Sequence, residues 1–208
     1  PNHLSLLFDP LDGTNPFRSE IPLFSTAVAG LIDGVPSLGA IYDPIHHVVY
    51  SASLRGAGRR TNAVAKVWHV GTGALAPLRT ERALTIKGRG NIRPIACQIT
   101  RDSAKRPAAL HIFQKLGNAF HDVYLFNAGH FSMVAVAKGG IDAYVNSWTY
   151  GWDVAAGEPL VRAIGGRVTD MSGQPIEYKN DRVAVIAAAT EETHAGILEA
   201  LYGTSSQD

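Results

Sequence analysis

Apolar and polar positions alternate differently in the two halves of this chain. In residues 1–90, apolar stretches are separated by turn sequences rich in Gly, Pro and Asp, which is typical of an antiparallel meander. The strands predicted in this way cover residues 24–32, 37–42 and 48–54. An additional apolar run at residues 4–8 predicts a short buried strand. Residues 63–90 show weak periodicity, which predicts a loop with one edge strand.

From residue 92 the pattern changes to an alternation of short apolar strands with longer helical segments. Strands are predicted over residues 92–98, 122–126, 143–146, 167–169 and 183–187, and helices over 103–116, 130–138, 153–164 and 191–202. Such alternation favours an α/β arrangement with helices on both faces of a sheet. We therefore expect an α+β sheet portion over residues 1–90 and an α/β domain over residues 91–208.

Composition narrows the function classes further. The 208 residues are enough to bury a substantial core. A net charge of +1 with 18% charged residues gives no electrostatic reason to expect a nucleic acid polymer or a membrane surface as partner. The single cysteine, Cys97, excludes an internal disulfide. Because no targeting pattern is recognisable, we expect a cytoplasmic location.

The segment at residues 9–14 reads DPLDGT and carries the strongest chemical signal. It places Asp9 and Asp12 where a predicted strand ends and the chain turns. Gly13 permits a close backbone approach, so that its amide and that of Thr14 can face a ligand. Carboxylates beside such amides suit a hard cation that carries a phosphate. A strand-end turn with a capping Asp is the alternative interpretation.

A second segment, WDVAAG at residues 152–157, opens the helical pattern predicted over 153–164. Asp153 is expected in the first turn of that helix, where the helix dipole favours a carboxylate. By itself Asp153 is better explained as a helix N-cap than as a metal ligand. Together with the first segment, it supplies a third carboxylate next to an element that suits phosphate.

Taken together, these two segments resemble the two signatures of the inositol monophosphatase family, which comprises magnesium-dependent, lithium-sensitive sugar phosphatases. The segment AKGGIDAY at residues 137–144 also resembles a family pattern, and the resemblance covers roughly residues 4–202. Haloacid dehalogenase phosphatases share an acidic motif ending in Gly-Thr, but their two Asp residues are two positions apart. Here the spacing is three, with Pro10 between them, so the family resemblance is favoured. It implies a layered αβαβα fold.

The resemblance also implies roles for individual residues. It assigns catalysis to Asp9, Asp12, Thr14 and Asp153, metal binding to Asp9, Asp12, Asp153 and the Leu11 carbonyl, and phosphate binding to Gly13 and Thr14. It assigns substrate contacts to Asp12, Asn127, Ala128, Gly129, Asn146 and Asp153. The implied cofactor is Mg²⁺, as two or three ions, with Mn²⁺ able to substitute. The implied assembly is a homodimer.

The chain departs from the family in two respects that bear on function. Members carry two helices and a Glu-bearing motif upstream of DPxDGT, and neither is present in this sequence. We therefore expect the first sheet to expose an apolar face and the metal site to lack one ligand. Asn146 stands where inositol phosphatases carry a Glu that contacts sugar hydroxyls, which weakens the case for inositol itself.

These observations predict Mg²⁺-dependent hydrolysis of a small phosphate monoester, an inositol, other polyol or sugar phosphate, by a metal-activated water. Alternatives in the same superfamily are a fructose-1,6-bisphosphatase and a 3′(2′),5′-bisphosphate nucleotidase. An alternative from another class is a catalytically weak regulatory homologue.

Overall fold

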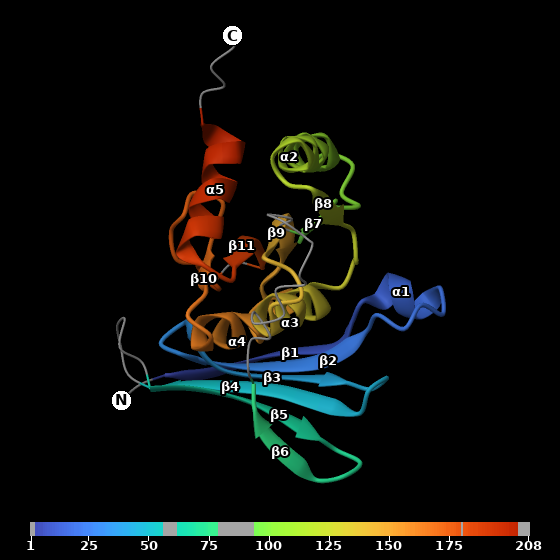
Figure 1. The fold of residues 1–208 in the computed structure, drawn as a ribbon, viewed down its shortest axis with the longest axis vertical. Helices are drawn as coiled ribbons and strands as arrows, with labels where there is room; N and C mark the ends of the chain where they lie inside the picture. Colours follow the sequence, from blue (N-terminus) through green and yellow to red (C-terminus); the bar gives the residue numbers. More distant parts are fainter. Residues whose placement is uncertain (1–2, 56–61, 79–93, 180, 204–208) are drawn as a thin grey trace, which may run out of the picture.

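The protein, seen in a computed structural model, forms two β-sheets with helices between and above them (Figure 1). The structure describes residues 3–55, 62–78, 94–179 and 181–203. The first sheet forms one outer layer, helices α3 and α4 lie between the two sheets, and helices α2 and α5 lie on the far side of the second sheet. This stacking confirms the predicted layered fold with helices on both faces of the second sheet.

The first sheet is an antiparallel meander, as predicted, in the order β1-β2-β3-β4-β5-β6. Its strands are β1 (Leu4–Asp12), β2 (Ser25–Ile32), β3 (Val35–Asp43), β4 (Val48–Arg55), β5 (Asn62–His69) and β6 (Ala74–Pro77), with the short helix α1 (Thr14–Arg18) after β1. The hairpin β5–β6 corrects the expectation of one edge strand in residues 63–90. Because these strands lie at the sheet edge and are largely exposed, their periodicity is weak. Residues 79–90 of that prediction lie outside the described residues.

The second sheet has the order β10-β11-β9-β7-β8. It comprises β7 (Pro94–Gln98), β8 (Asp122–Tyr124), β9 (Ala143–Tyr150), β10 (Arg167–Thr169) and β11 (Arg182–Ala188). The helices are α2 (Arg106–Ala119), α3 (Gly129–Lys138), α4 (Gly157–Ala163) and α5 (Glu191–Tyr202). Strand β7 runs parallel to both of its neighbours, β8 and β9, whereas β11 is antiparallel to both of its neighbours, β9 and β10. None of the helices in the described ranges is long and apolar enough to cross a lipid bilayer.

The helix predicted over residues 153–164 is divided in the structure, which corrects the expected place of Asp153. A 3₁₀ turn covers Gly151–Asp153, and α4 begins only at Gly157. The residues between them are buried and pack directly on β3, where a Cβ on Gly39 would lie 2.1 Å from the Ala156 carbonyl oxygen. This close packing fixes an irregular backbone where the sequence pattern alone predicts a continuous helix.

The outer face of the first sheet is apolar and is not covered by any described residue. Leu4, Leu6 and Phe8 are 59%, 61% and 62% exposed, and Leu6, Leu38 and Val64 line a shallow groove of about 740 Å³. The prediction of a buried strand at residues 4–8 is therefore wrong for this face, because alternate side chains of β1 point away from α3 and α4. The expected exposure of an apolar face on the first sheet is confirmed.

Candidate active site

A bulge in β1 brings the first two carboxylates to the same side of the sheet. Asp9 lies opposite Ala27 and Asp12 lies opposite Ser25, so β1 has one more residue than β2 between these pairs. In a regular strand, residues three positions apart face opposite sides. The extra residue of a β-bulge reverses this and turns Asp12 toward the side of Asp9. The bulge contains Pro10, which has no amide to leave unpaired.

Asp12 joins the end of β1 to the start of α3. Its Oδ1 accepts a hydrogen bond from the Gly129 amide and its Oδ2 accepts one from the His130 amide, both at 2.9 Å. The first amides of a helix have no partner within the helix, and the helix dipole favours negative charge there. Asp12 thus caps α3 with a side chain from a distant strand.

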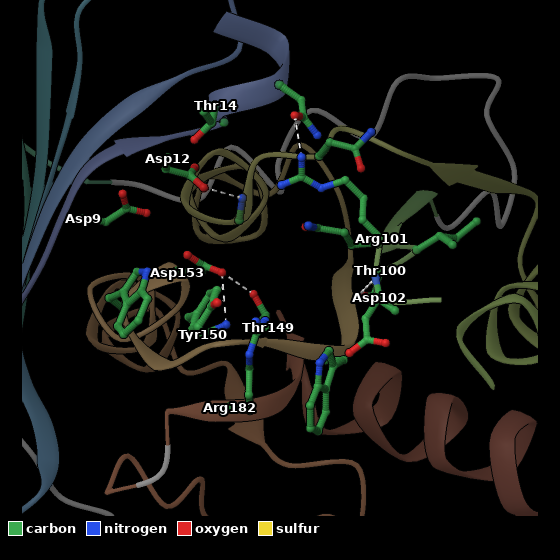
Figure 2. A pocket seen from close by; sticks show the side chains of 18 of the residues that line it. Asp9, Asp12, Thr14, Thr100, Arg101, Asp102, Thr149, Tyr150, Asp153 and Arg182 are labelled. Atoms are coloured by element: carbon green, nitrogen blue, oxygen red, sulfur yellow. Dashed lines mark hydrogen bonds between the residues drawn. The ribbon is translucent and has the colours of Figure 1, made fainter. Parts of the chain in front are cut away.

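Asp153 is oriented by the end of β9, the strand that precedes it. The Thr149 hydroxyl and the Tyr150 amide both donate to Asp153 Oδ2, as the dashed lines in Figure 2 show. Among the described residues, nothing donates to the other carboxylate oxygen, Oδ1. Beside it, His130 Nε2 donates to the Trp152 carbonyl at 2.9 Å, which ties the turn of Asp153 to α3. Asp153 is therefore held with one oxygen available to the pocket.

These elements enclose a pocket of about 520 Å³ (Figure 2). Of the residues predicted from sequence, the pocket is lined by Asp9, Leu11, Asp12, Gly13, Thr14, Asn127, Gly129 and Asp153. Ala128 and Asn146 are buried, each 1% exposed, and neither lines the pocket. The Asn146 amide instead donates to the Tyr144 hydroxyl at 3.0 Å, and its Oδ1 accepts from the Trp148 amide at 3.1 Å.

The carboxylates of this pocket are electrostatically costly without a cation. Burial raises the pKa of Asp9 from 3.8 to about 6, and the negative charges of Asp12 and Asp153 add to the effect. Burial likewise raises the pKa of Asp12 to about 7, against the lowering effect of the Gly129 amide. Burial lowers the pKa of His130 below its ordinary 6.5, although the nearby carboxylates of Asp9 and Asp153 act in the opposite direction. His130 in turn partly offsets the rise in the pKa of Asp9.

The donor set suits a hard cation. Asp9, Asp12 and Asp153 offer carboxylate oxygens, and the Leu11 carbonyl lies beside them, where it accepts the Thr14 hydroxyl at 3.0 Å. Within the described residues, no three acidic, His or Cys side chains already converge tightly enough to hold a metal ion by themselves. Mg²⁺ fits such a loose set, because it retains several of its water ligands when it binds a protein.

Several lining residues were not predicted from sequence. They are Gln98 at the end of β7, Thr100, Arg101 and Asp102 after β7, Trp148 in β9, Trp152 just after β9, and Arg182 at the start of β11. Apart from Trp152, which belongs to the WDVAAG segment, no local motif marks them. A usable signal was topological, because open α/β sheets bind ligands outside the carboxyl ends of their parallel strands, here β7 and β9.

Comparison with known proteins agrees with this geometry. The profile of the inositol monophosphatase family matches residues 2–205. Nus factor SuhB of Pasteurella multocida is 29% identical over 167 residues, which cover 80% of this chain and 57% of that protein. The chain thus spans less than two thirds of that curated relative.

Solved structures show the same fold. The extragenic suppressor protein suhB from Bartonella henselae superposes with a TM-score of 0.75 at 24% identity, covering 98% of this chain and 70% of that one. The inositol monophosphatase from Anabaena gives the same TM-score and identity, covering 99% and 75%. The match of the family profile to nearly all of the sequence shows that this chain belongs to the inositol monophosphatase family.

Proposed function

We propose that this chain carries the catalytic centre of a Mg²⁺-dependent phosphatase that hydrolyses a small phosphate monoester of a polyol or sugar. The observation that carries the proposal is the arrangement of Asp9, Asp12 and Asp153 around one pocket beside the first amides of α1. The raised pKa values of Asp9 and Asp12 show that burial and neighbouring carboxylates disfavour their charged forms, which a bound cation would stabilise. Family membership supports the same chemistry at a coarser level.

In this proposal Asp9, Asp12, Asp153 and the Leu11 carbonyl hold two or three Mg²⁺ ions, for which Mn²⁺ can substitute. When bound, Mg²⁺ neutralises phosphate charge, lowers the pKa of a water and stabilises the leaving oxygen. The amides of Gly13 and Thr14 bind phosphate oxygens, because the first amides of a helix have no helical partner.

The remaining predicted residues complete the pocket in different ways. The Thr14 hydroxyl, which donates to the Leu11 carbonyl in this structure, orients the attacking water. Asn127 and Gly129 line the pocket and contact the substrate. Ala128 and Asn146 lie behind the wall, so we assign them to support, Asn146 through Tyr144 and the Trp148 amide. A pocket of about 520 Å³ suits a phosphorylated molecule of hexose size.

A regulatory role is a second candidate, because a curated relative bears the name Nus factor SuhB. In that case the chain acts as an assembly partner and its phosphatase activity is weak or dispensable. Homodimerisation, lithium inhibition and a cytoplasmic location stay predictions from the resemblance and the composition.

Phosphate release by the intact protein tests the proposal. The panel comprises inositol 1-phosphate, fructose 1,6-bisphosphate, adenosine 3′,5′-bisphosphate and histidinol phosphate, each with and without Mg²⁺. Asp153→Asn should abolish release, whereas Asp122→Asn, which removes a carboxylate from an exposed position at the start of β8, should not. Mg²⁺-dependent release that is lost only in Asp153→Asn supports the phosphatase. A folded, Mg²⁺-saturated protein that releases no phosphate from any of them favours the regulatory candidate.

A further inference from the structure

One wall of the pocket is cationic and aromatic, and the proposed monoester chemistry makes no use of it. Arg101 reaches the pocket from the loop between β7 and α2, and Arg182 reaches it from the start of β11, as Figure 2 shows. Trp148 and Tyr150 of β9 line the same wall. Two guanidinium groups at the edge of the proposed phosphate-binding pocket favour a ligand with negative charge.

Arg182 is held in place by aromatic rings. Its guanidinium carbon lies 3.4 Å from the centroid of the Tyr150 ring and 5.8 Å from that of Trp148. Tyr150 in turn stacks on Trp152, with centroids 4.3 Å apart and planes 11° apart. A guanidinium that stacks on a ring keeps its in-plane N–H groups available, in a fork that matches the oxygens of a phosphate.

Arg101 is placed by a well-bonded loop. Its Nη1 donates to Asn15 Oδ1 at 2.8 Å, which puts the guanidinium next to the phosphate-binding turn. The loop itself is closed by the Ala104 amide, which donates to Asp102 Oδ1 at 2.9 Å, and by Arg106 Nη2, which donates to the Arg101 carbonyl at 3.0 Å. These bonds fix the backbone from which Arg101 extends, although the side chain is exposed.

The charge balance of this wall favours an anion. Within the described residues, neither Arg101 nor Arg182 forms an ion pair with a carboxylate. Asp102 also lines the wall, and one of its carboxylate oxygens is used by the turn. A neutral polyol would leave both guanidinium groups without a counter-charge. Moreover, Asn146, the residue expected to contact sugar hydroxyls, has its side chain bonded behind the wall.

We propose that Arg101 and Arg182 form an anion subsite that binds a second phosphate group of the substrate. The substrate class is therefore a bisphosphate, in which one phosphate occupies the carboxylate side of the pocket and the other occupies the arginine side. This inference rests on the proposed function for the identity of the first phosphate. The two sources of such a ligand are sugar bisphosphates and nucleoside bisphosphates, whose base could stack on the aromatic wall.

Binding rather than turnover tests the subsite. The probes are two matched pairs, fructose 1,6-bisphosphate with fructose 1-phosphate, and adenosine 3′,5′-bisphosphate with adenosine 3′-phosphate. Dissociation constants are measured by titration calorimetry on the intact protein with Mg²⁺, in an Asp153→Asn background so that the ligand persists. In at least one pair, the bisphosphate should bind about tenfold more tightly or better, as expected for a charge-assisted contact. The pair that shows the preference identifies the source.

The variants Arg101→Gln and Arg182→Gln should each reduce that preference by about tenfold. Lys66→Gln is the matched control, because it removes the same charge from an exposed position on β5 in the first sheet. The melting temperature of each variant is measured alongside, and if Arg182→Gln does not fold, Arg101→Gln on its exposed loop carries the test.

Equal binding within both pairs, or a preference that both arginine variants retain, overturns the subsite. If phosphate is released from monoesters without any bisphosphate preference, the subsite is wrong and the proposed phosphatase stands. If the preference depends on the arginines but wild-type protein releases no phosphate, the subsite stands and the phosphatase proposal is wrong.

Discussion

The amide of Gly129 donates a 2.9 Å hydrogen bond to Asp12 Oδ1, across 117 positions of the sequence. Gly129 also lies against the other acidic segment, because a Cβ added to it would be 2.6 Å from the Asp153 carbonyl oxygen. One residue without a side chain thus contacts both acidic segments of the pocket. The relative position of Asp12 and Asp153 depends on that close approach.

We expect Gly129→Ala to destabilise the fold by about 1–3 kcal/mol, because the new methyl group overlaps backbone that must shift. The shift separates Asp153 from Asp12, so phosphatase activity should fall more than the loss of folded protein explains. Thermal unfolding and phosphate release on the same samples measure both effects.

Gly117→Ala serves as the control. Gly117 lies in α2, and a Cβ there meets nothing within 4 Å. Since Ala is favoured over Gly in helices by about 0.5–1 kcal/mol, this variant should be as stable as the wild type or more stable. If the two variants have the same thermal stability and the same phosphate release, the contact at Gly129 is not needed to hold the pocket.

Sequence patterns predicted the elements whose burial alternates regularly. The helix expected over 191–202 matches α5, and the strand expected over 167–169 matches β10, because each has one face on the core. The β5–β6 hairpin was missed since its strands are largely exposed and carry little hydrophobic signal. The break before α4 was missed because its cause, the contact between Ala156 and Gly39, lies in a different sheet.

The candidate site likewise contains residues that the sequence predicted and residues that it did not. The carboxylates and the Gly13 turn belong to short contiguous motifs, so sequence alone located them. Arg101 and Arg182 lie in unrelated segments that only the fold brings to one pocket. Asn146 was predicted to contact substrate from its position in a motif, and its side chain is taken up by hydrogen bonds within its own strand.

Glu158 of α4 predicts a pH effect on stability away from the pocket. It is buried, accepts hydrogen bonds from the Tyr178 hydroxyl at 2.7 Å and from Arg162 at 3.1 Å, and burial raises its pKa above the ordinary 4.5. The folded state then binds a proton that the unfolded chain releases, so the free energy of unfolding falls as pH rises above 4.5. Glu158→Gln keeps an acceptor for Tyr178 and cannot ionise, so its stability should fall less with pH than the wild type does.

Urea denaturation at several pH values between 5 and 8 measures this difference. If the difference in the free energy of unfolding between Glu158→Gln and wild type stays constant over the whole pH range, Glu158 titrates alike in the folded and unfolded states. In that case the ion pair with Arg162 offsets the burial of the carboxylate.

The pocket carboxylates predict a similar fall of the free energy of unfolding with rising pH in the metal-free protein. Asp9 and Asp12 have pKa values of about 6 and about 7 against an ordinary 3.8, so the folded state retains protons that the unfolded chain loses. In EDTA, the free energy of unfolding should therefore fall, on the order of a few kcal/mol, between about pH 4 and pH 7. Asp12→Asn should flatten this fall even though it lowers overall stability, because its amide nitrogen cannot accept one of the two hydrogen bonds from the start of α3. A wild-type profile without a fall in EDTA would contradict the raised pKa values.

Mg²⁺ should reverse that loss of stability at neutral pH. Binding to the folded state alone stabilises by RT ln(1 + [L]/Kd), which is about 2.7 kcal/mol when the free ion is at 100 times Kd. For a chain of this size, this corresponds to a rise in melting temperature of about 5–10 °C. Asp153→Asn should reduce the rise, because it removes a ligand of the site. Asp102→Asn should retain it, because this carboxylate lines the opposite wall and caps a turn. Scanning calorimetry at several millimolar concentrations of Mg²⁺ measures the melting temperature of each protein. A melting temperature that does not rise with Mg²⁺, or that rises equally in both variants, would show that the three carboxylates of the pocket do not act together as a metal site.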